Sequence, residues 1–255
     1  MDAIVVNNIV QSYALLSKNH ENHENTTRWI SRIAVGGIIV TVHKPSCGAN
    51  QLVQCCAKYG DLELLRAVTI ANDLSQHDLN YVKNIAAFNG HLECLKFAMM
   101  TERKVRFGNS GNYENCGKYG RHESYKICES AALGGHLHVL KWADNMGCPR
   151  LSDICHFASR NGHLEVLQWL IQTGSRMNEM MCADAAFYGH LDVLKWVRLQ
   201  NLPCPWNNII CEYAALNGHL DVLKWARAQD PPCSWNEMIC SSAAKNGHLD
   251  ILSWA

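Results

Sequence analysis

The chain has no excess of charge of either sign. Lysine and arginine together number 23, aspartate and glutamate also number 23, and the formal net charge at pH 7 is 0 with the 13 histidines neutral. A protein that holds a polyanion by electrostatics needs a basic surface. We therefore expect neither nucleic acid nor a membrane as a partner.

A long hydrophobic run is also missing, although 48% of the residues are hydrophobic. The longest apolar stretch, residues 33–42, contains two glycines and is too short to cross a bilayer, so it predicts a buried strand or helix. No secretory signal peptide accompanies the 13 cysteines. This combination predicts a reducing compartment and a cytoplasmic location.

Signatures of catalysis are absent as well. The chain contains no Gly-x-Ser-x-Gly and no His-Glu-x-x-His motif. Residues 111–118 approach a phosphate-binding loop, but five residues instead of four separate Gly111 from Gly117, and Tyr119 replaces the Ser or Thr that binds Mg²⁺. We expect a protein that is not an enzyme, with no catalytic residue, no cofactor and no bound metal.

The chain does contain an internal repeat of the form Gly-His-Leu-Asp/Glu-x-Leu-Lys-Trp. Successive copies are separated by 30, 45, 27, 27, 29 and 29 residues, a near-constant period with one insertion. Such a period predicts a stack of small units, each of which needs its neighbours to bury its apolar face. The repeat glycines are Gly60, Gly90, Gly135, Gly162, Gly189, Gly218 and Gly247.

Each unit is typical of a helix, a glycine break and a second helix. Small residues, mostly alanine, stand three and four positions before the glycine, where they let two helices approach closely. Leucine occupies the second and fifth positions after the glycine, and in six units an aromatic residue occupies the seventh, which outlines one apolar helix face. Glycine accepts the left-handed conformation that ends the first helix. We expect neighbouring units to bury the tryptophans.

Histidine follows the repeat glycine in six units, and cysteine precedes it by seven residues in five. One histidine per unit cannot converge on a single metal ion, so these histidines are expected to be structural. Helices packed about 8–10 Å apart hold successive cysteines too far apart for a disulfide, so we expect small core residues. This cysteine ladder comprises Cys128, Cys155, Cys182, Cys211 and Cys240.

The stretch Ala185-Ala186-Phe187-Tyr188-Gly189-His190-Leu191-Asp192, and its copy from Ala214, closely resembles the helix-turn-helix of the ankyrin repeat. The resemblance covers about residues 50–255 and implies an all-α fold, an ankyrin-type α-solenoid of about seven repeats. The period is shorter than the family's roughly 33 residues, which implies short inter-repeat loops. The Trp-Asn-rich linkers are similar to those of ankyrin arrays encoded by large DNA viruses of protists. Such a viral protein would be a monomer in the host cytoplasm.

Ankyrin arrays usually bind partners on a concave face that includes the ends of the first helices. The two residues before each glycine map to that face, and the first of them varies while the framework stays constant. A binding surface would show this contrast, and so would drift at an exposed helix end. Phe88, Phe187 and Tyr188 are the expected anchors. The predicted partner-binding residues are Lys58, Tyr59, Phe88, Asn89, Leu133, Arg160, Asn161, Phe187, Tyr188, Leu216, Asn217, Lys245 and Asn246.

Three segments depart from the repeat. Residues 1–50 are predicted to cap the solenoid of residues 51–255, and a faint similarity of residues 2–16 to the start of an F-box is the alternative. A Gly-rich insertion near residues 101–122 predicts a loop that either carries specificity or has no function. Trp254, in the last unit, is expected to be exposed by fraying, covered by a longer array or bound to a partner.

The sequence therefore predicts a non-catalytic scaffold whose concave face binds a protein, a host protein if the chain is viral. The first alternative is a substrate receptor of a ubiquitin ligase, in which residues 1–50 recruit an adaptor. The second alternative is a metal- or nucleotide-dependent enzyme whose catalytic groups lie far apart in the sequence.

Overall fold

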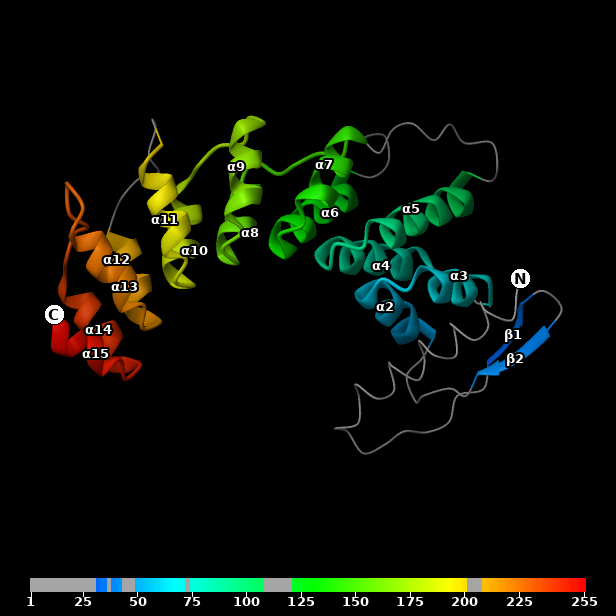
Figure 1. The fold of residues 1–255 in the computed structure, drawn as a ribbon, viewed down its shortest axis with the longest axis horizontal. Coiled ribbons are helices and arrows are strands. Elements are labelled where there is room, and N and C mark those ends of the chain that lie inside the picture. The colour runs from blue at the N-terminus through cyan, green and yellow to red at the C-terminus, as the bar shows by residue number, and fades with distance from the viewer. Residues whose placement is uncertain (1–30, 36–37, 43–48, 72–73, 108–120, 201–207) are drawn as a thin grey trace. The chain divides into compact units, whose positions relative to one another are not determined.

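The computed structural model describes residues 31–35, 38–42, 49–71, 74–107, 121–200 and 208–255. The chain divides into two compact units, residues 1–113 and residues 114–255. From Ala49 onward the described residues fold into helices, which confirms the predicted all-α class (Figure 1). The division predicted at residue 50 lies inside the first unit.

The first unit contains a hairpin followed by two helix pairs. β1 (Ser31–Val35) runs antiparallel to β2 (Ile38–Val42), with Ile33 opposite Val40, so the apolar run forms strands. Strand β1 contacts α3, and α2 contacts α4. The F-box-like stretch predicted over residues 2–16 lies outside the described residues. The helices are α2 (Ala49–Tyr59), α3 (Leu62–Ala71), α4 (Gln76–Phe88) and α5 (Leu92–Phe107).

The described part of the second unit consists of stacked helix pairs. The first helix of each pair contacts the first helix of the next, so that α6, α8, α10, α12 and α14 follow one another in chain order. The helices are α6 (Arg121–Gly134), α7 (Leu137–Asn145), α8 (Ile154–Arg160), α9 (Leu164–Gln172), α10 (Glu179–Phe187), α11 (Leu191–Arg198), α12 (Asn208–Leu216), α13 (Leu220–Arg227), α14 (Glu237–Lys245) and α15 (Leu249–Trp254).

The repeat glycine ends the first helix of each pair, as predicted. Gly189 has a φ of +77°, and the amide of His190 donates to the carbonyl of Ala185 at 2.8 Å. This bond satisfies a carbonyl in the last turn of α10 while a left-handed residue reverses the chain. The second helix begins two residues later, with Asp192 in its first turn.

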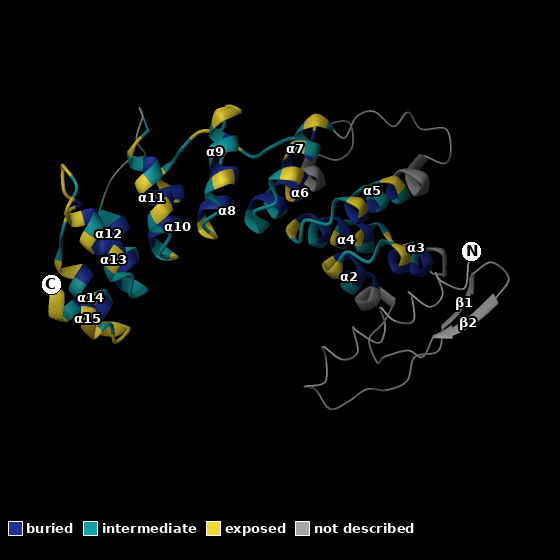
Figure 2. Ribbon diagram, viewed as in Figure 1, coloured by how far each residue is buried: buried dark blue, intermediate teal, exposed yellow. Residues whose placement is uncertain are grey.

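The core of each unit lies between the stacked pairs (Figure 2). In the fifth repeat Ala185 and Ala186, before the glycine, are fully buried, and so is Val193 on the following helix. The predicted apolar face was wrong at its first position, because Leu191 begins α11 and is only half-buried. The tryptophans were expected to be buried and are half-buried instead. The half-buried tryptophans at this position are Trp142, Trp169, Trp196 and Trp225.

Two irregular segments also differ from their predictions. Residues 101–107 and 121–122 were expected in a loop but continue α5 and begin α6, respectively, while residues 108–120 lie outside the described residues. At the last pair, Trp254 is 36% exposed, and its ring contacts the ring of Trp235 edge to face at 5.6 Å. Trp254 is therefore helical and partly covered by its own repeat.

Candidate functional site

The predicted partner-binding residues lie where the first helix of each pair ends. In the first unit Lys58 and Tyr59 end α2, Phe88 ends α4 and Asn89 caps that helix. The second unit places the others at the ends of α6, α8, α10, α12 and α14. We call this second set the helix-end row, and it comprises Leu133, Arg160, Asn161, Phe187, Tyr188, Leu216, Asn217, Lys245 and Asn246.

Members of the helix-end row differ in how far their side chains are exposed to solvent. Arg160 and Tyr188 are exposed, whereas Phe187 and Leu216 are half-buried. Asn217 Nδ2 donates to the carbonyl of Tyr213 in its own helix at 3.2 Å, whereas Asn161 Nδ2 donates to the carbonyl of Leu133 in the preceding pair at 2.7 Å. The first of the two residues before each glycine therefore differs in chemistry along the row, while the asparagine side chains donate to backbone carbonyls near the turns.

The repeat histidines hold the helix-end row in place. His190 Nε2 donates to the carbonyl of Arg160 at 3.0 Å, which joins the turn of one pair to the helix end of the preceding pair. The same bond recurs along the second unit. Its other members run from His163 to Leu133, from His219 to Phe187 and from His248 to Leu216, at 3.0–3.1 Å. In the first unit His91 Nε2 donates to the carbonyl of Lys58 at 2.9 Å.

The same histidines explain why the turn residue is glycine. A Cβ built on Gly162 would lie 2.6 Å from Nδ1 of His190, and a Cβ on Gly189 would lie 2.5 Å from Nδ1 of His219. Cβ atoms do not make non-bonded contacts this short, so the imidazole occupies the space that a side chain would need. The prediction of structural histidines at the turn holds, and the structure adds that they act between pairs.

A cationic and aromatic cluster lies at the centre of the helix-end row. Arg160 Nε donates to Tyr188 Oη at 2.8 Å, and the guanidinium lies 5.2 Å from the centre of the Tyr188 ring. The Phe187 ring contacts Tyr188 at 4.9 Å and meets Tyr213 edge to face at 5.5 Å. These four residues, from α8, α10 and α12 and their caps, are called the Arg160 cluster.

Members of the Arg160 cluster orient one another before any ligand arrives. An arginine over an aromatic face, with a hydrogen bond to its hydroxyl, keeps its planar donors in a defined direction. Tyrosine and arginine are also the residues that most often dominate protein interfaces. Tyr213 was not among the predicted residues, because it stands five positions before its glycine, inside α12. Only the stacking of α10 on α12 brings it to the row.

The cysteine ladder is buried, as predicted, except at its last member. Cys128, Cys155, Cys182 and Cys211 are at most 1% exposed, whereas Cys240 is half-buried. Burial raises the pKa of the Cys155 thiol to about 11, so that thiol stays protonated at neutral pH. Cys182 is disulfide-bonded, whereas the other four ladder members are free thiols. No disulfide therefore joins two ladder members, as the distance argument predicted.

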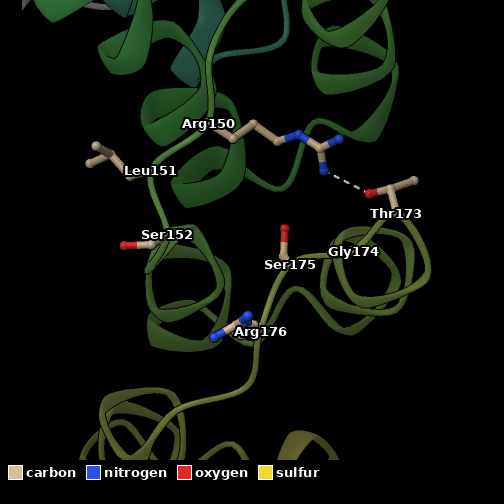
Figure 3. A pocket seen from close by; sticks show the side chains of 7 residues that line it. All are labelled: Arg150, Leu151, Ser152, Thr173, Gly174, Ser175 and Arg176. Atoms are coloured by element: carbon tan, nitrogen blue, oxygen red, sulfur yellow. Dashed lines mark hydrogen bonds between the residues drawn. The ribbon is translucent and has the colours of Figure 1, made fainter.

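One pocket of about 280 Å³ lies where the linkers on either side of α8 and α9 meet (Figure 3). Arg150 reaches across it, donating to Thr173 Oγ1 at 2.7 Å and pairing with Asp144 at 2.7 Å. The Arg150 guanidinium also covers the ring of Trp169 at 5.1 Å. The pocket lining contains no acid, and its central arginine ties two linkers together. Its lining residues are Arg150, Leu151, Ser152, Thr173, Gly174, Ser175 and Arg176.

In the described part of the chain, no group of three or more His, Cys, Asp or Glu side chains is placed to hold a metal ion. Within the same residues no helix combines the length and the apolar character that crossing a membrane requires. His156 and Asp184 do form a close pair, with Nδ1 and Oδ2 3.1 Å apart, and they join α8 to α10 inside the stack.

Comparison with known proteins adds no family. No protein-family model matches the chain. No curated protein matches its sequence. Function is therefore inferred from the repeat and from the surface that the repeat builds.

Proposed function

We propose that this chain is an ankyrin-type repeat array that binds a protein partner through its helix ends, with the Arg160 cluster as the centre of contact. The observation that carries the proposal is the cluster itself. It combines an exposed arginine and an exposed tyrosine with two half-buried aromatic rings on three successive pairs. Such a group offers a large contact area at a small cost in side-chain entropy.

Rigid presentation supports the same proposal. The backbone beneath the cluster is fixed by the hydrogen bonds from His190 to Arg160 and from His219 to Phe187. Beneath these turns the alanines before the glycines are fully buried. Because the frame is already ordered, binding orders little besides the partner, which favours affinity. The chemistry of the cluster suits a partner surface that carries a carboxylate beside apolar groups.

Affinity capture with purified bait tests the proposal. The full chain, the double variant Arg160→Ala with Tyr188→Ala, and a control variant are each used to capture proteins from a eukaryotic cell lysate, and captured proteins are quantified by mass spectrometry. The control is Met180→Ala, which removes a side chain that is 56% exposed at the opposite end of α10. Thermal unfolding of each variant checks that the array is intact.

We expect one partner to be captured by the full chain and by the control, with at least a tenfold loss in affinity for the double variant. This corresponds to about 1.4 kcal/mol or more, which is modest for two central contact residues. Equal capture by the double variant, or equal losses in the double variant and the control, would show that the helix-end row is not the contact surface.

A further inference from the structure

The second unit contains a second cysteine position that pairs with the ladder. It lies fourteen residues before the repeat glycine of the following pair, in the linker between two pairs. Cys148, Ser175 and Cys233 occupy it, opposite ladder members Cys128, Cys155 and Cys211, respectively. The same register assigns Cys204, which lies outside the described residues, to Cys182. Cysteine thus occupies both positions in three of these four repeats.

Backbone hydrogen bonds place this linker position identically in the repeats. The amide of Cys148 donates to the carbonyl of Ala143 at 2.9 Å, and the amide of Cys233 donates to the carbonyl of Ala226 at 3.1 Å. Both acceptors stand eight residues after their repeat glycines, at a fully buried position of the second helix. The amide of Ser175 makes the corresponding bond to Leu170 at 2.9 Å. The linker side chain is therefore directed back into its own repeat.

There the linker side chain meets the ladder cysteine. The thiols of Cys211 and Cys233 are hydrogen-bonded to each other, and both residues are 0% exposed. Two repeats earlier, the Ser175 side chain makes the equivalent hydrogen bond to Cys155. Arg227 Nη1 donates to the carbonyl of Cys233 at 2.8 Å and secures the linker from the other side.

The surroundings make the two thiols chemically unequal. The hydrogen bond between them lowers the pKa of Cys233 and raises that of Cys211, and desolvation further raises the pKa of Cys211. Desolvation opposes the lowering at Cys233, where a backbone hydrogen bond from Cys211 adds to it, while the charges of Arg227 and Glu212 act on both thiols in the same directions. Cys233 is therefore the thiol that ionises first and the better nucleophile.

We propose that Cys211 and Cys233 form a reversible disulfide within their repeat, that Cys128 and Cys148 form its counterpart, and that a low-molecular-weight disulfide such as oxidised glutathione supplies the oxidising equivalents. The bonded state of Cys182 shows that the ladder position accommodates a disulfide in this fold. The Cys211–Cys233 bond would tie the linker that precedes α14 to helix α12. It would thereby fix the spacing between two successive pairs.

The exchange balances without any further reactant. The Cys233 thiolate attacks one sulfur of oxidised glutathione, forming a mixed disulfide and releasing one glutathione thiolate. Cys211 then loses its proton and attacks the Cys233 sulfur, which forms the protein disulfide and releases the second glutathione. The two thiol protons pass to the two glutathione thiolates. Cys233 is buried, but Pro232 and Ser234 beside it are exposed, so local opening of the linker admits the reagent.

Thiol trapping tests the proposal on the full chain. The protein is equilibrated at a series of glutathione ratios, quenched with acid, alkylated in denaturant and mapped by peptide mass spectrometry. We expect Cys211 and Cys233, and likewise Cys128 and Cys148, to appear as cross-linked peptides at oxidising ratios and as alkylated thiols at reducing ratios. Cys155 faces serine and should be alkylated throughout, which makes it the internal control.

Two variants sharpen the result. Cys233→Ser places at the linker the residue that Ser175 already provides, so the repeat should fold, and Cys211 should then be alkylated at every ratio. Ser175→Cys should create a new cross-link to Cys155. Thermal unfolding should show that oxidation raises the Tm of the wild type by roughly 5 °C more than that of Cys233→Ser. Alkylation of Cys211 and Cys233 to the same extent as Cys155 at all ratios would overturn the proposal.

Discussion

At the residue scale, one glycine and one histidine form the joint between successive pairs. The positive φ of Gly189 turns the chain, and the absence of a side chain leaves room for His219. The histidine then donates to the carbonyl of Phe187, two residues before that glycine. The glycine is therefore required for two reasons, one local to its own turn and one arising from the histidine of the next pair.

Replacing Gly189 by alanine should therefore cost more than a strained turn alone. We expect a loss of about 1–2 kcal/mol for the left-handed conformation and about 1–3 kcal/mol more for displacing His219. The matched control is Gly247→Ala, because Gly247 has a φ of +76° and nothing within 4 Å of its added Cβ. Urea unfolding of both variants measures the difference.

A double variant isolates the contact. In a His219→Ala background, Gly189→Ala should cost no more than Gly247→Ala costs in the wild type, since the imidazole is gone. Equal costs for Gly189→Ala and Gly247→Ala in the wild-type background would mean that His219 moves away freely and that the joint is looser than the structure indicates.

At the scale of the element, the first helices of the pairs begin in different ways. Asn178 caps α10, and its Oδ1 accepts a hydrogen bond from the amide of Met181 at 3.0 Å; Asn236 caps α14 in the same manner. Asp153 stands at the start of α8 and makes no such side-chain bond. Helices α9, α11, α13 and α15 begin after histidines whose side chains are hydrogen-bonded to the preceding pair. Short helices of this kind depend on caps and stacking because isolated helices of their length are unstable.

The caps should differ in their contributions to stability. Asn178→Ala is expected to lower the free energy of unfolding by about 1 kcal/mol, because the amide of Met181 loses its acceptor. Asp153→Ala should cost less than half as much, since no capping bond is lost. Denaturant unfolding of the two variants provides the measurement. A larger effect at Asp153 would show that its contact with His156, at 3.9 Å, matters more than capping.

At the scale of the whole molecule, buried thiols couple stability to alkaline pH. Desolvation by burial raises the pKa of Cys94 and that of Cys155 from 9.0 to about 11. The unfolded chain therefore loses these protons near pH 9 while the folded chain keeps them until about pH 11. Above pH 9 the unfolded state binds fewer protons, so the stability contributed by each neutral thiol is complete below pH 9 and is lost as the pH rises toward 11.

Alkaline unfolding should show this loss directly. Each thiol is expected to account for on the order of 1–3 kcal/mol between pH 9 and pH 11. The urea midpoint of wild type should fall more steeply over this range than that of Cys155→Ala, because other titrating groups are common to both proteins. Parallel curves would mean that the folded Cys155 thiol ionises as readily as the unfolded one.

The repeating helix–turn–helix frame was predictable from the sequence. Helix, glycine break and helix follow from local physics, since a left-handed residue, small side chains before it and apolar spacing after it act within one repeat. For the same reason the predicted binding residues do lie at helix ends, and the all-α class was predictable. The apolar run of residues 33–42 remained ambiguous between strand and helix because its pattern lacks a period.

The contacts between repeats become visible only in the folded chain. Folding brings the Tyr213 ring to Phe187 and Arg160 to Tyr188, and it places Cys233 against Cys211. It also joins His163, His190, His219 and His248 to the preceding helix ends. These contacts link residues about twenty to thirty positions apart, and sequence spacing along one helix carries no information about them. Half-burial of the tryptophans has the same origin, because the exposure of a ring depends on how closely neighbouring pairs stack.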